Sequence, residues 1–319
     1  MFLINLFLFA VGCVVLWFSS SLVVSGVERF SRSVRISSFV TSFLLLGVLT
    51  SLGEISVGIN SILDKRPEIF VGDLIGGSFV IVTLIIPILA IFGRGLTLSQ
   101  HLQPKKLSFF LVLVVAPPLL ILDGFVSRYD GLLLILFYAV FFNLFQKSEK
   151  IWETVDLKKL EDGKTEINLA KIIAGAVLIF LASKILVDKT IYFADLLRIP
   201  SFLISILFLS IGTNLPEMVI AARAIKSNHK SIALGDYVGS AATNSLLFGV
   251  LILVHGPFEI ATGVFNATLF ILLLGYILFF SFAHSRKHLS LIQGVVLLLI
   301  YVLFLMIQTT EIFLVSPKI

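Results

Sequence analysis

Residues 212–217 read G-T-N-L-P-E, and residues 49–54 read L-T-S-L-G-E. A shift of 163 positions, which takes residue 50 to residue 213, superimposes them without a gap. The same shift superimposes G-D-L-I-G-G-S at 72–78 on G-D-Y-V-G-S-A at 235–241, and residues 50–84 share nine identities with their counterparts. A duplicated polar segment interrupted by glycine or proline, inside a hydrophobic chain, is typical of the binding site of a transporter.

The composition indicates a polytopic membrane protein. Of the 319 residues, 58% are hydrophobic and 13% are charged, and the mean hydropathy is +1.08. These values lie outside the range of soluble globular domains. The single cysteine, Cys13, excludes an internal disulfide. The net charge of +5 does not indicate nucleic acid, because membrane proteins use basic loops to set their orientation. We therefore expect the lipid bilayer as a partner and infer no protein partner.

Apolar stretches separated by polar residues predict an all-α membrane protein with ten transmembrane helices. The predicted spans are 2–25, 37–63, 70–93, 107–126, 131–145, 168–187, 200–225, 232–254, 262–283 and 289–308. We interpret the first as a span and not as a signal peptide, since no basic residue precedes it. The spans form two five-helix repeats, 1–145 and 168–319, joined by a hydrophilic linker at 146–167. The polar motifs lie inside the second and seventh spans, which we expect to be broken helices.

An odd number of spans in each repeat has a topological consequence. The second repeat enters the membrane in the opposite orientation to the first, so the two form an inverted repeat. Lys and Arg are more frequent in the loops after the odd-numbered spans, including the linker, than in the other loops. Since basic loops favour the cytoplasmic side, we expect a cytoplasmic linker and both termini outside. The expected location is the plasma membrane.

Glu54 and Glu217 lie at the two motifs, deep within their predicted spans. A charged side chain at the centre of a span is disfavoured by roughly 2.5–3.5 kcal/mol, and no Lys or Arg lies at a comparable depth. Pro216 frees a backbone carbonyl one turn earlier. Carbonyls, hydroxyls and carboxylates are ligands suited to group 1 or group 2 cations, so we expect a bound cation or a proton at these acids. The alternative is two protonated acids that only hydrogen-bond between helices.

A second element of the duplication contains Asp73 and Asp236. Gly72 and Gly76 have the four-residue spacing of small residues that allows helices to pack closely, and packing accounts for them. Asp73 and Asp236 lie a few residues into their spans. They are equally compatible with helix caps or interface anchors and with gate or pathway carboxylates.

These paired motifs resemble the alpha-repeats of the cation/calcium antiporter superfamily, and most of all its sodium/calcium exchanger branch. The resemblance covers residues 50–84 and their counterparts, and it implies that Glu54 and Glu217 coordinate calcium as the metal ligands of the site. Further cation-binding residues that the resemblance implies are the side chains of Thr50, Ser51, Thr213, Asn214, Ser240 and Asn244 and the backbone carbonyls of Gly47 and Ser210.

Three positions depart from the family pattern. The third-span serine and amide positions of the first copy hold Gly77 and Ile81, which have no side-chain oxygen, and Gly53 replaces the expected proline. The side-chain oxygens that remain still exceed the about 6–8 that calcium takes. A divalent site is therefore feasible, whereas fewer side-chain oxygens remain for a full set of separate sodium sites.

The favoured function is secondary active cation antiport. We expect sodium/calcium exchange by alternating access, with ions bound between the alpha-repeats at the bilayer midplane and no cofactor. Because burial disfavours the charged form of a carboxylate, proton-coupled exchange of calcium or another divalent cation is the alternative. A remote alternative is an intramembrane aspartyl protease, but the first glycine of its G-x-G-D motif is absent from F-V-G-D at 70–73 and A-L-G-D at 233–236. A channel is less favoured, since broken helices in inverted repeats are typical of alternating access.

Overall fold

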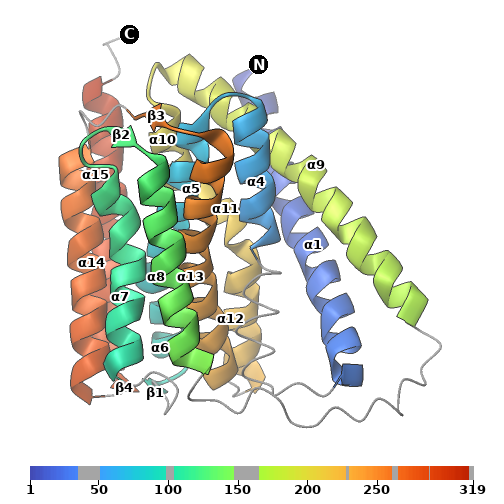
Figure 1. The fold of residues 1–319 in the computed structure, drawn as a ribbon, viewed down its shortest axis with the longest axis vertical. Coiled ribbons are helices and arrows are strands. Elements are labelled where there is room, and N and C mark those ends of the chain that lie inside the picture. Colours follow the sequence, from blue (N-terminus) through green and yellow to red (C-terminus); the bar gives the residue numbers. More distant parts are fainter. Residues whose placement is uncertain are drawn as a thin grey trace.

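The computed structural model shows a bundle of long helices that run roughly side by side, with both termini at the same end (Figure 1). The structure describes residues 1–34, 51–97, 104–146, 165–227, 230–260, 265–286 and 288–315. Predicted features that lie elsewhere, including most of the linker and the first half of the second span, are outside the described residues.

The helices of the first half overlap the predicted spans. They are α1 (Phe2–Val34), α4 (Leu52–Leu63), α5 (Pro67–Val80), the π-helix η2 (Ile81–Ile85), α6 (Ile86–Phe92), α7 (Pro104–Leu120) and α8 (Arg128–Gln146). The helix α1 ends nine residues later than predicted, and α7 ends six residues earlier. The segments α5, η2 and α6 follow one another without a gap and correspond to one predicted span.

The second half has a similar order of helices, with one span divided further. It contains α9 (Thr165–Leu197), α10 (Ser201–Ile204), the π-helix η4 (Ser205–Leu209), α11 (Ser210–Thr213), α12 (Leu215–Ser227), α13 (Lys230–His255), α14 (Phe265–Arg286) and α15 (Leu291–Val315). Asn214 alone separates α11 from α12, so the seventh predicted span is interrupted at the motif, as the sequence predicts.

Six segments in the described part of the chain are long and apolar enough to cross a membrane. They are Phe2–Val23, Pro67–Phe92, Ala170–Leu197, Tyr237–His255, Ala267–His284 and Leu291–Thr310. The other predicted spans correspond to α8, which has 19 residues, to α7, which has 17, and to the short apolar helices α4 and Ser201–Thr213 next to the motifs. The chain is therefore a mostly helical, multi-pass membrane protein, and its ten-span topology stays a prediction.

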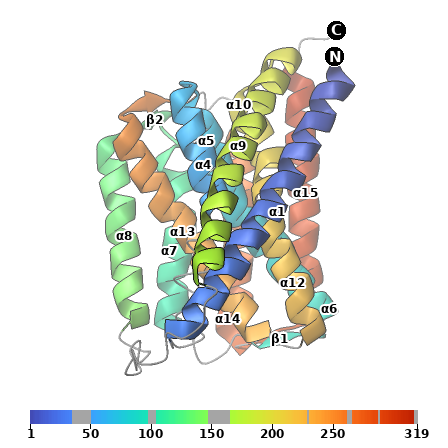
Figure 2. The ribbon, with the colours of Figure 1, turned by 90° about the vertical axis from the view of Figure 1, so that its right-hand side faces the viewer.

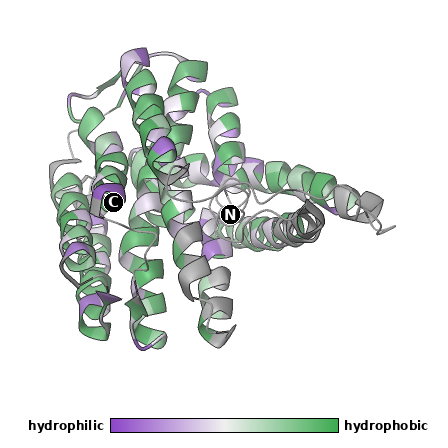
Figure 3. Cartoon of the chain, turned by 60° about the horizontal axis from the view of Figure 1, so that its bottom comes forward, coloured by the Kyte–Doolittle hydropathy of each residue, from purple (hydrophilic) through white to green (hydrophobic). Residues whose placement is uncertain are grey.

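The helix α5 lies at the centre of the bundle, whereas α1 and α9 lie at its side. Phe70 and Phe79 of α5 are fully buried and pack edge-on or tilted against Phe258 and Phe304 of other segments. The helices α1 and α9 run next to each other along one face (Figure 2). Apolar residues cover most of the helix surfaces and polar residues gather near the ends (Figure 3), a distribution suited to surrounding lipid.

Two pairs of short strands join loops at opposite ends of the bundle (Figure 1). The strand β1 (Leu96–Thr97) pairs with β4 (His288–Leu289), and β2 (Phe125–Val126) pairs with β3 (Phe258–Glu259), both antiparallel. The shift of 163 takes residues 125–126 to 288–289 and takes residue 96 to 259. Each pair is therefore the counterpart of the other, although the two lie at opposite ends.

Candidate cation-binding site

Glu54 and Glu217 occupy equivalent places, each in the first turn of a helix that begins at the motif. The helices α4 and α12 begin at Leu52 and Leu215, which the shift of 163 superimposes. Glu54 is 2% exposed and Glu217 is fully buried. A helix N-terminus favours negative charge, which lowers the cost of burying these carboxylates.

The glycines of α5 allow this helix to lie directly against the seventh predicted span. A Cβ atom added at Gly72 would lie 2.6 Å from the carbonyl oxygen of Phe202, and one at Gly76 would lie 2.8 Å from that of Ile206. Real Cβ atoms do not approach a backbone so closely, so larger residues would force the helices apart. The packing interpretation of these two glycines is confirmed.

Gly77 lies against two side-chain amides from the second repeat. A Cβ atom there would be 2.9 Å from Asn214 Nδ2 and 3.0 Å from Asn244 Nδ2. These amides occupy the space that the family's serine would need, which gives a physical reason for the glycine. Ile81, the second departure in the same predicted span, is fully buried in the apolar core. The neighbouring Ser78 donates its hydroxyl hydrogen to the carbonyls of Leu74 and Ala241.

The second repeat surrounds Glu217 with hydroxyl groups. Ser240 Oγ donates a hydrogen bond to Glu217 Oε1 at 3.4 Å, and the Tyr237 hydroxyl donates to the Glu217 backbone carbonyl at 3.2 Å. Tyr237 is fully buried and is not among the residues that the sequence predicts for the site. A tyrosine inside the duplicated G-D-Y-V-G motif, opposite Leu74 in the first copy, is the signal that could have identified it.

Three more predicted residues lie at the break between α11 and α12: Asn214 forms the break, and Ser210 and Thr213 are the two ends of α11. Asn214 Nδ2 donates to the Ser210 carbonyl at 2.8 Å and to Thr213 Oγ1 at 3.4 Å. The Ser210 carbonyl, which the resemblance implies as an ion ligand, therefore accepts a hydrogen bond from this amide in the structure. Thr213, Asn214 and Ser210 are all fully buried.

Asp73 lies beside the broken helix and not at a helix end. Its carboxylate is fully buried, seven residues into α5, and Oδ1 accepts a hydrogen bond of 2.9 Å from the Thr213 hydroxyl. Asp73 therefore does not cap α5, and its interpretations as an interface anchor or as a pathway carboxylate stay predictions. The side chain of Asp236 and the residues Gly47 and Thr50 lie outside the described residues, whereas Ser51 is described and buried at the start of α4.

Several buried oxygen atoms of these side chains accept no hydrogen bond. They are Glu54 Oε2, Asp73 Oδ2, Asn214 Oδ1 and Asn244 Oδ1. Buried acceptors in proteins are nearly always paired, and oxygens of this kind bind hard cations. Within the described ranges, no three His, Cys, Asp or Glu side chains form a metal-binding cluster. Any cation held here would therefore be coordinated by amide and hydroxyl oxygens as well as by carboxylates.

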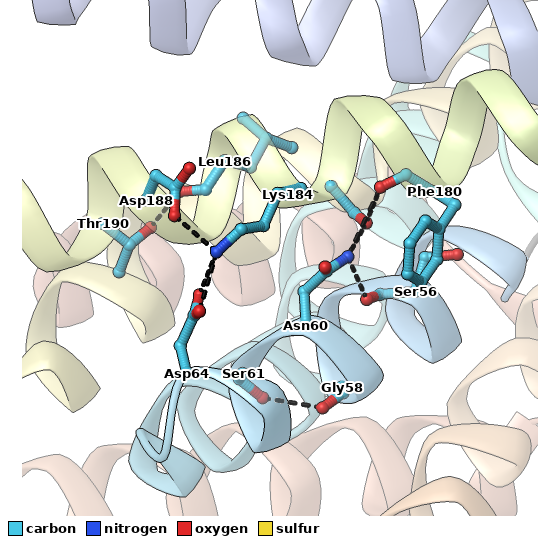
Figure 4. A network of polar contacts seen from close by, with 11 residues as sticks. Ser56, Gly58, Asn60, Ser61, Asp64, Phe180, Lys184, Leu186, Asp188 and Thr190 are labelled. Carbon is cyan, nitrogen blue, oxygen red and sulfur yellow. Dashed lines mark hydrogen bonds and ion pairs between the residues drawn. The ribbon is translucent and has the colours of Figure 1, made fainter.

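A lysine on the neighbouring helix α9 is paired with acids other than Glu54. Lys184 Nζ contacts Asp64 Oδ2 at 2.6 Å and Asp188 Oδ1 at 2.8 Å (Figure 4). Asn60 Nδ2 donates to Ser183 Oγ at 2.7 Å in the same network. This network connects the end of α4 to α9 and leaves Glu54 without a basic partner among the described residues.

Comparison with known proteins identifies the family of the chain. The sequence profile of the family described as Sodium/calcium exchanger protein matches residues 4–146 and 167–310. The chain belongs to this family. As a member of the exchanger family it is a membrane transporter and not an enzyme, so the protease alternative is wrong.

Individual relatives of the exchanger family match along most of their length. The sodium/calcium exchanger MaX1 of Methanosarcina acetivorans is 24% identical over 352 aligned positions, covering 96% of this chain and 99% of the relative. The uncharacterized membrane protein MJ0091 of Methanocaldococcus jannaschii is 26% identical over 300 residues, with 92% and 95% covered. A solved structure of the sodium-calcium exchanger NCX_Mj superimposes with a TM-score of 0.67 at 23% identity, covering 96% and 99%. The structural likeness shows a shared fold, and the family supports cation/calcium antiport.

Proposed function

We propose that this protein exchanges sodium for calcium across the membrane by alternating access. The observation that carries the proposal is the set of buried oxygens without a hydrogen-bond partner on Glu54, Asp73, Asn214 and Asn244, of which the two amides lie against Gly77 of α5. Two carboxylates with amide and hydroxyl oxygens suit calcium, which takes about 6–8 oxygen ligands. The proposed calcium ligands are Glu54, Glu217, Thr50, Ser51, Thr213, Asn214, Ser240 and Asn244, with the backbone carbonyls of Gly47 and Ser210.

The proposed architecture is a pair of inverted five-helix repeats with ten spans in all. Two observations support it. The counterpart strand pairs lie at opposite ends of the bundle (Figure 1), as a two-fold axis in the membrane plane requires. Ser78 also hydrogen-bonds to Ala241, its own counterpart under the shift, and counterparts touch only close to a two-fold axis. The ion site would then lie between the repeats near the bilayer midplane.

The proposed orientation follows from the basic loops. A linker at 146–167 rich in lysine faces the cytoplasm, both termini face outside, and the membrane is the plasma membrane. Both ends of the chain lie at one end of the bundle (Figure 1), which supports an even number of crossings.

Proton coupling is the second candidate, and one observation favours it. Gly77 and Ile81 contribute no side-chain oxygen, and the space beside Gly77 contains amide nitrogens. Fewer oxygen ligands make several simultaneous sodium positions harder to build. Buried carboxylates that take up protons need no such ligands, because the proton neutralises the charge that burial disfavours.

Transport measurements on purified protein in sealed liposomes separate the two candidates. In one set of liposomes, the uptake of radiolabelled calcium is measured with an outward sodium gradient at fixed pH. In a second set, it is measured with a pH gradient and without sodium. Sodium exchange predicts uptake in the first set only. Uptake in the second set only would replace sodium by protons, and uptake in neither set would contradict antiport. Glu217→Gln in the same liposomes controls for leak.

A further inference from the structure

Tyr237 joins the backbone of Glu217 to the helix that carries two of the other proposed ligands. Its side chain in α13 is fully buried, and its hydroxyl donates a hydrogen bond of 3.2 Å to the Glu217 carbonyl in α12. Ser240, one turn further along α13, donates to Glu217 Oε1 at 3.4 Å. Two hydrogen bonds from one helix therefore hold both the main chain and the carboxylate of this acid.

The residues of α13 that take part share one face of the helix. Tyr237, Ser240 and Asn244 are separated by three and four residues, and positions with this spacing are neighbours on a helix surface. Ser240 and Asn244 are proposed calcium ligands, and Tyr237 anchors the first turn of α12, which carries Glu217. The relative positions of these ligands therefore depend on how α12 is fixed to α13.

The first copy of the motif has no equivalent of this anchor. The shift of 163 takes Leu74 to Tyr237 and Gly77 to Ser240, and neither Leu74 nor Gly77 has a side-chain donor. Leu74 is also buried, with 2% of its surface exposed. An apolar side chain thus fills the corresponding place in α5, so close packing at this position of the motif does not require a hydroxyl group.

A role in packing alone would favour a different side chain in α13. A buried hydroxyl costs free energy unless it is hydrogen-bonded, and phenylalanine would fill nearly the same space without that cost. The Tyr237 hydroxyl forms its bond at the residue that carries the buried carboxylate. Ligands held in place discriminate between cations by size, because selectivity depends on the size of the site and on how far its ligands can move.

We propose that Tyr237 is a positioning residue that fixes Glu217 at a distance suited to calcium and so sets the selectivity of the site among divalent cations. It acts on the backbone of a ligand residue and not on the ion. The inference deepens the proposed sodium/calcium exchange and rests on it for the calcium site. The two acids then differ: Glu217 is held in place before the ion binds, whereas Glu54, without counterparts of these two hydrogen bonds, adjusts to the ion.

Equilibrium binding of ⁴⁵Ca²⁺ to the purified full-length protein in sodium-free buffer, with barium as the competitor, tests the proposal. Barium has the same charge as calcium and a larger radius. Tyr237→Phe keeps the ring and removes the hydroxyl, so the Kd of calcium is expected to rise about 3–10-fold, the worth of one hydrogen bond. The ratio of the barium Kd to the calcium Kd is expected to fall, because a Glu217 with more freedom accommodates the larger ion.

Tyr276→Phe is the matched control for the loss of a buried hydroxyl. Tyr276 in α14 is also fully buried, and its hydroxyl has no hydrogen-bond partner among the described residues. Both Kd values should therefore stay as in the wild type. The same fall of the ratio in Tyr276→Phe would show that any buried hydroxyl has this effect, and would overturn the specific role of Tyr237.

The ratio of the two Kd values separates positioning from stability. An unchanged ratio in a folded Tyr237→Phe variant would overturn the proposal even if calcium bound more weakly, because a general loss of stability weakens the binding of both ions alike. The absence of saturable calcium binding by the wild type would instead contradict the proposed calcium exchange, and this inference with it. If Tyr237→Phe does not fold, Tyr237→Met fills the space with a flexible side chain that has no donor, and the same comparison decides.

Discussion

The helices α5 and α13 carry the same motif but contribute differently to the site. In α13, Ser240 donates a hydrogen bond to Glu217, and Asn244 has a buried oxygen without a partner. In α5 and the π-helix that continues it, the equivalent positions are Gly77 and Ile81. Amides of the other repeat fill the space beside the first, and the second is buried in the core. The two copies therefore differ: α5 packs closely against the other repeat, whereas α13 carries two of the proposed calcium ligands.

The two copies remain alike in the acids at the starts of α4 and α12, Glu54 and Glu217. We expect substitutions of these two acids to have the largest effect on calcium uptake. Glu54→Gln and Glu217→Gln each remove one charged ligand of the proposed calcium ion. Breaking a buried charge pair costs about 3–5 kcal/mol, so calcium uptake into liposomes should fall more than about 100-fold. Membrane insertion and size-exclusion profiles should stay as in the wild type. Near-normal uptake in either variant would refute the site.

The different roles of α5 and α13 predict unequal effects at counterpart positions. Asn244→Leu keeps the volume of the side chain but removes an oxygen, so the concentration of calcium for half-maximal uptake should rise about 10–100-fold, the worth of a contact to a charged group. Ile81→Leu, at the matching position of the first copy, should leave it unchanged. Equal effects of the two substitutions would remove the proposed asymmetry.

Restoring the family's serine in α5 should disturb the packing and not improve transport. Gly77→Ser places a Cβ atom within about 3 Å of two amides, and overpacking a close contact costs about 1–3 kcal/mol. The midpoint of thermal unfolding should therefore fall. Gly77→Ala is the control that separates the Cβ atom from the hydroxyl and should show a similar fall. A stable Gly77→Ser variant with faster transport would show that the space is available after all.

The smallest effect is expected away from both motifs, in the network between α4 and α9 (Figure 4). Lys184 is 41% exposed and pairs with Asp64 and Asp188. Exposed ion pairs contribute about 0–1 kcal/mol, so Lys184→Met should change the thermal unfolding midpoint slightly and the calcium uptake rate not at all. A large loss of uptake in Lys184→Met would indicate that this lysine acts on the site.

Part of the site could be predicted from the sequence because the duplication marks it. The break at Asn214, the burial of Glu54 and Glu217 and the close packing at Gly72 and Gly76 all follow from local chemistry. Proline interrupts a helix, glycine allows close approach, and an acid inside a membrane span must be shielded from lipid. The contact between Asp73 and Thr213 could not be predicted. It depends on how two helices from different repeats cross, and motif spacing within one helix does not contain that information.

The surroundings of Gly77 also could not be predicted from the sequence. The lack of a side-chain oxygen at Gly77 is evident in the sequence, but the reason is not, because the amides that occupy its space come from Asn214 and Asn244 of the other repeat. The contact of Tyr237 likewise joins two helices, because its hydroxyl in α13 donates a hydrogen bond to the backbone carbonyl of Glu217 in α12. Contacts between repeats are set by the packing of the whole bundle.

Calcium titration of the purified protein by isothermal calorimetry tests the central claim most directly, because it needs no coupling ion. The account predicts saturable binding of calcium to the wild type in sodium-free buffer, and no detectable binding to the double variant Glu54→Gln/Glu217→Gln. Saturable binding that persists in a correctly folded double variant, or its absence from the wild type, would contradict a calcium site built on these two acids.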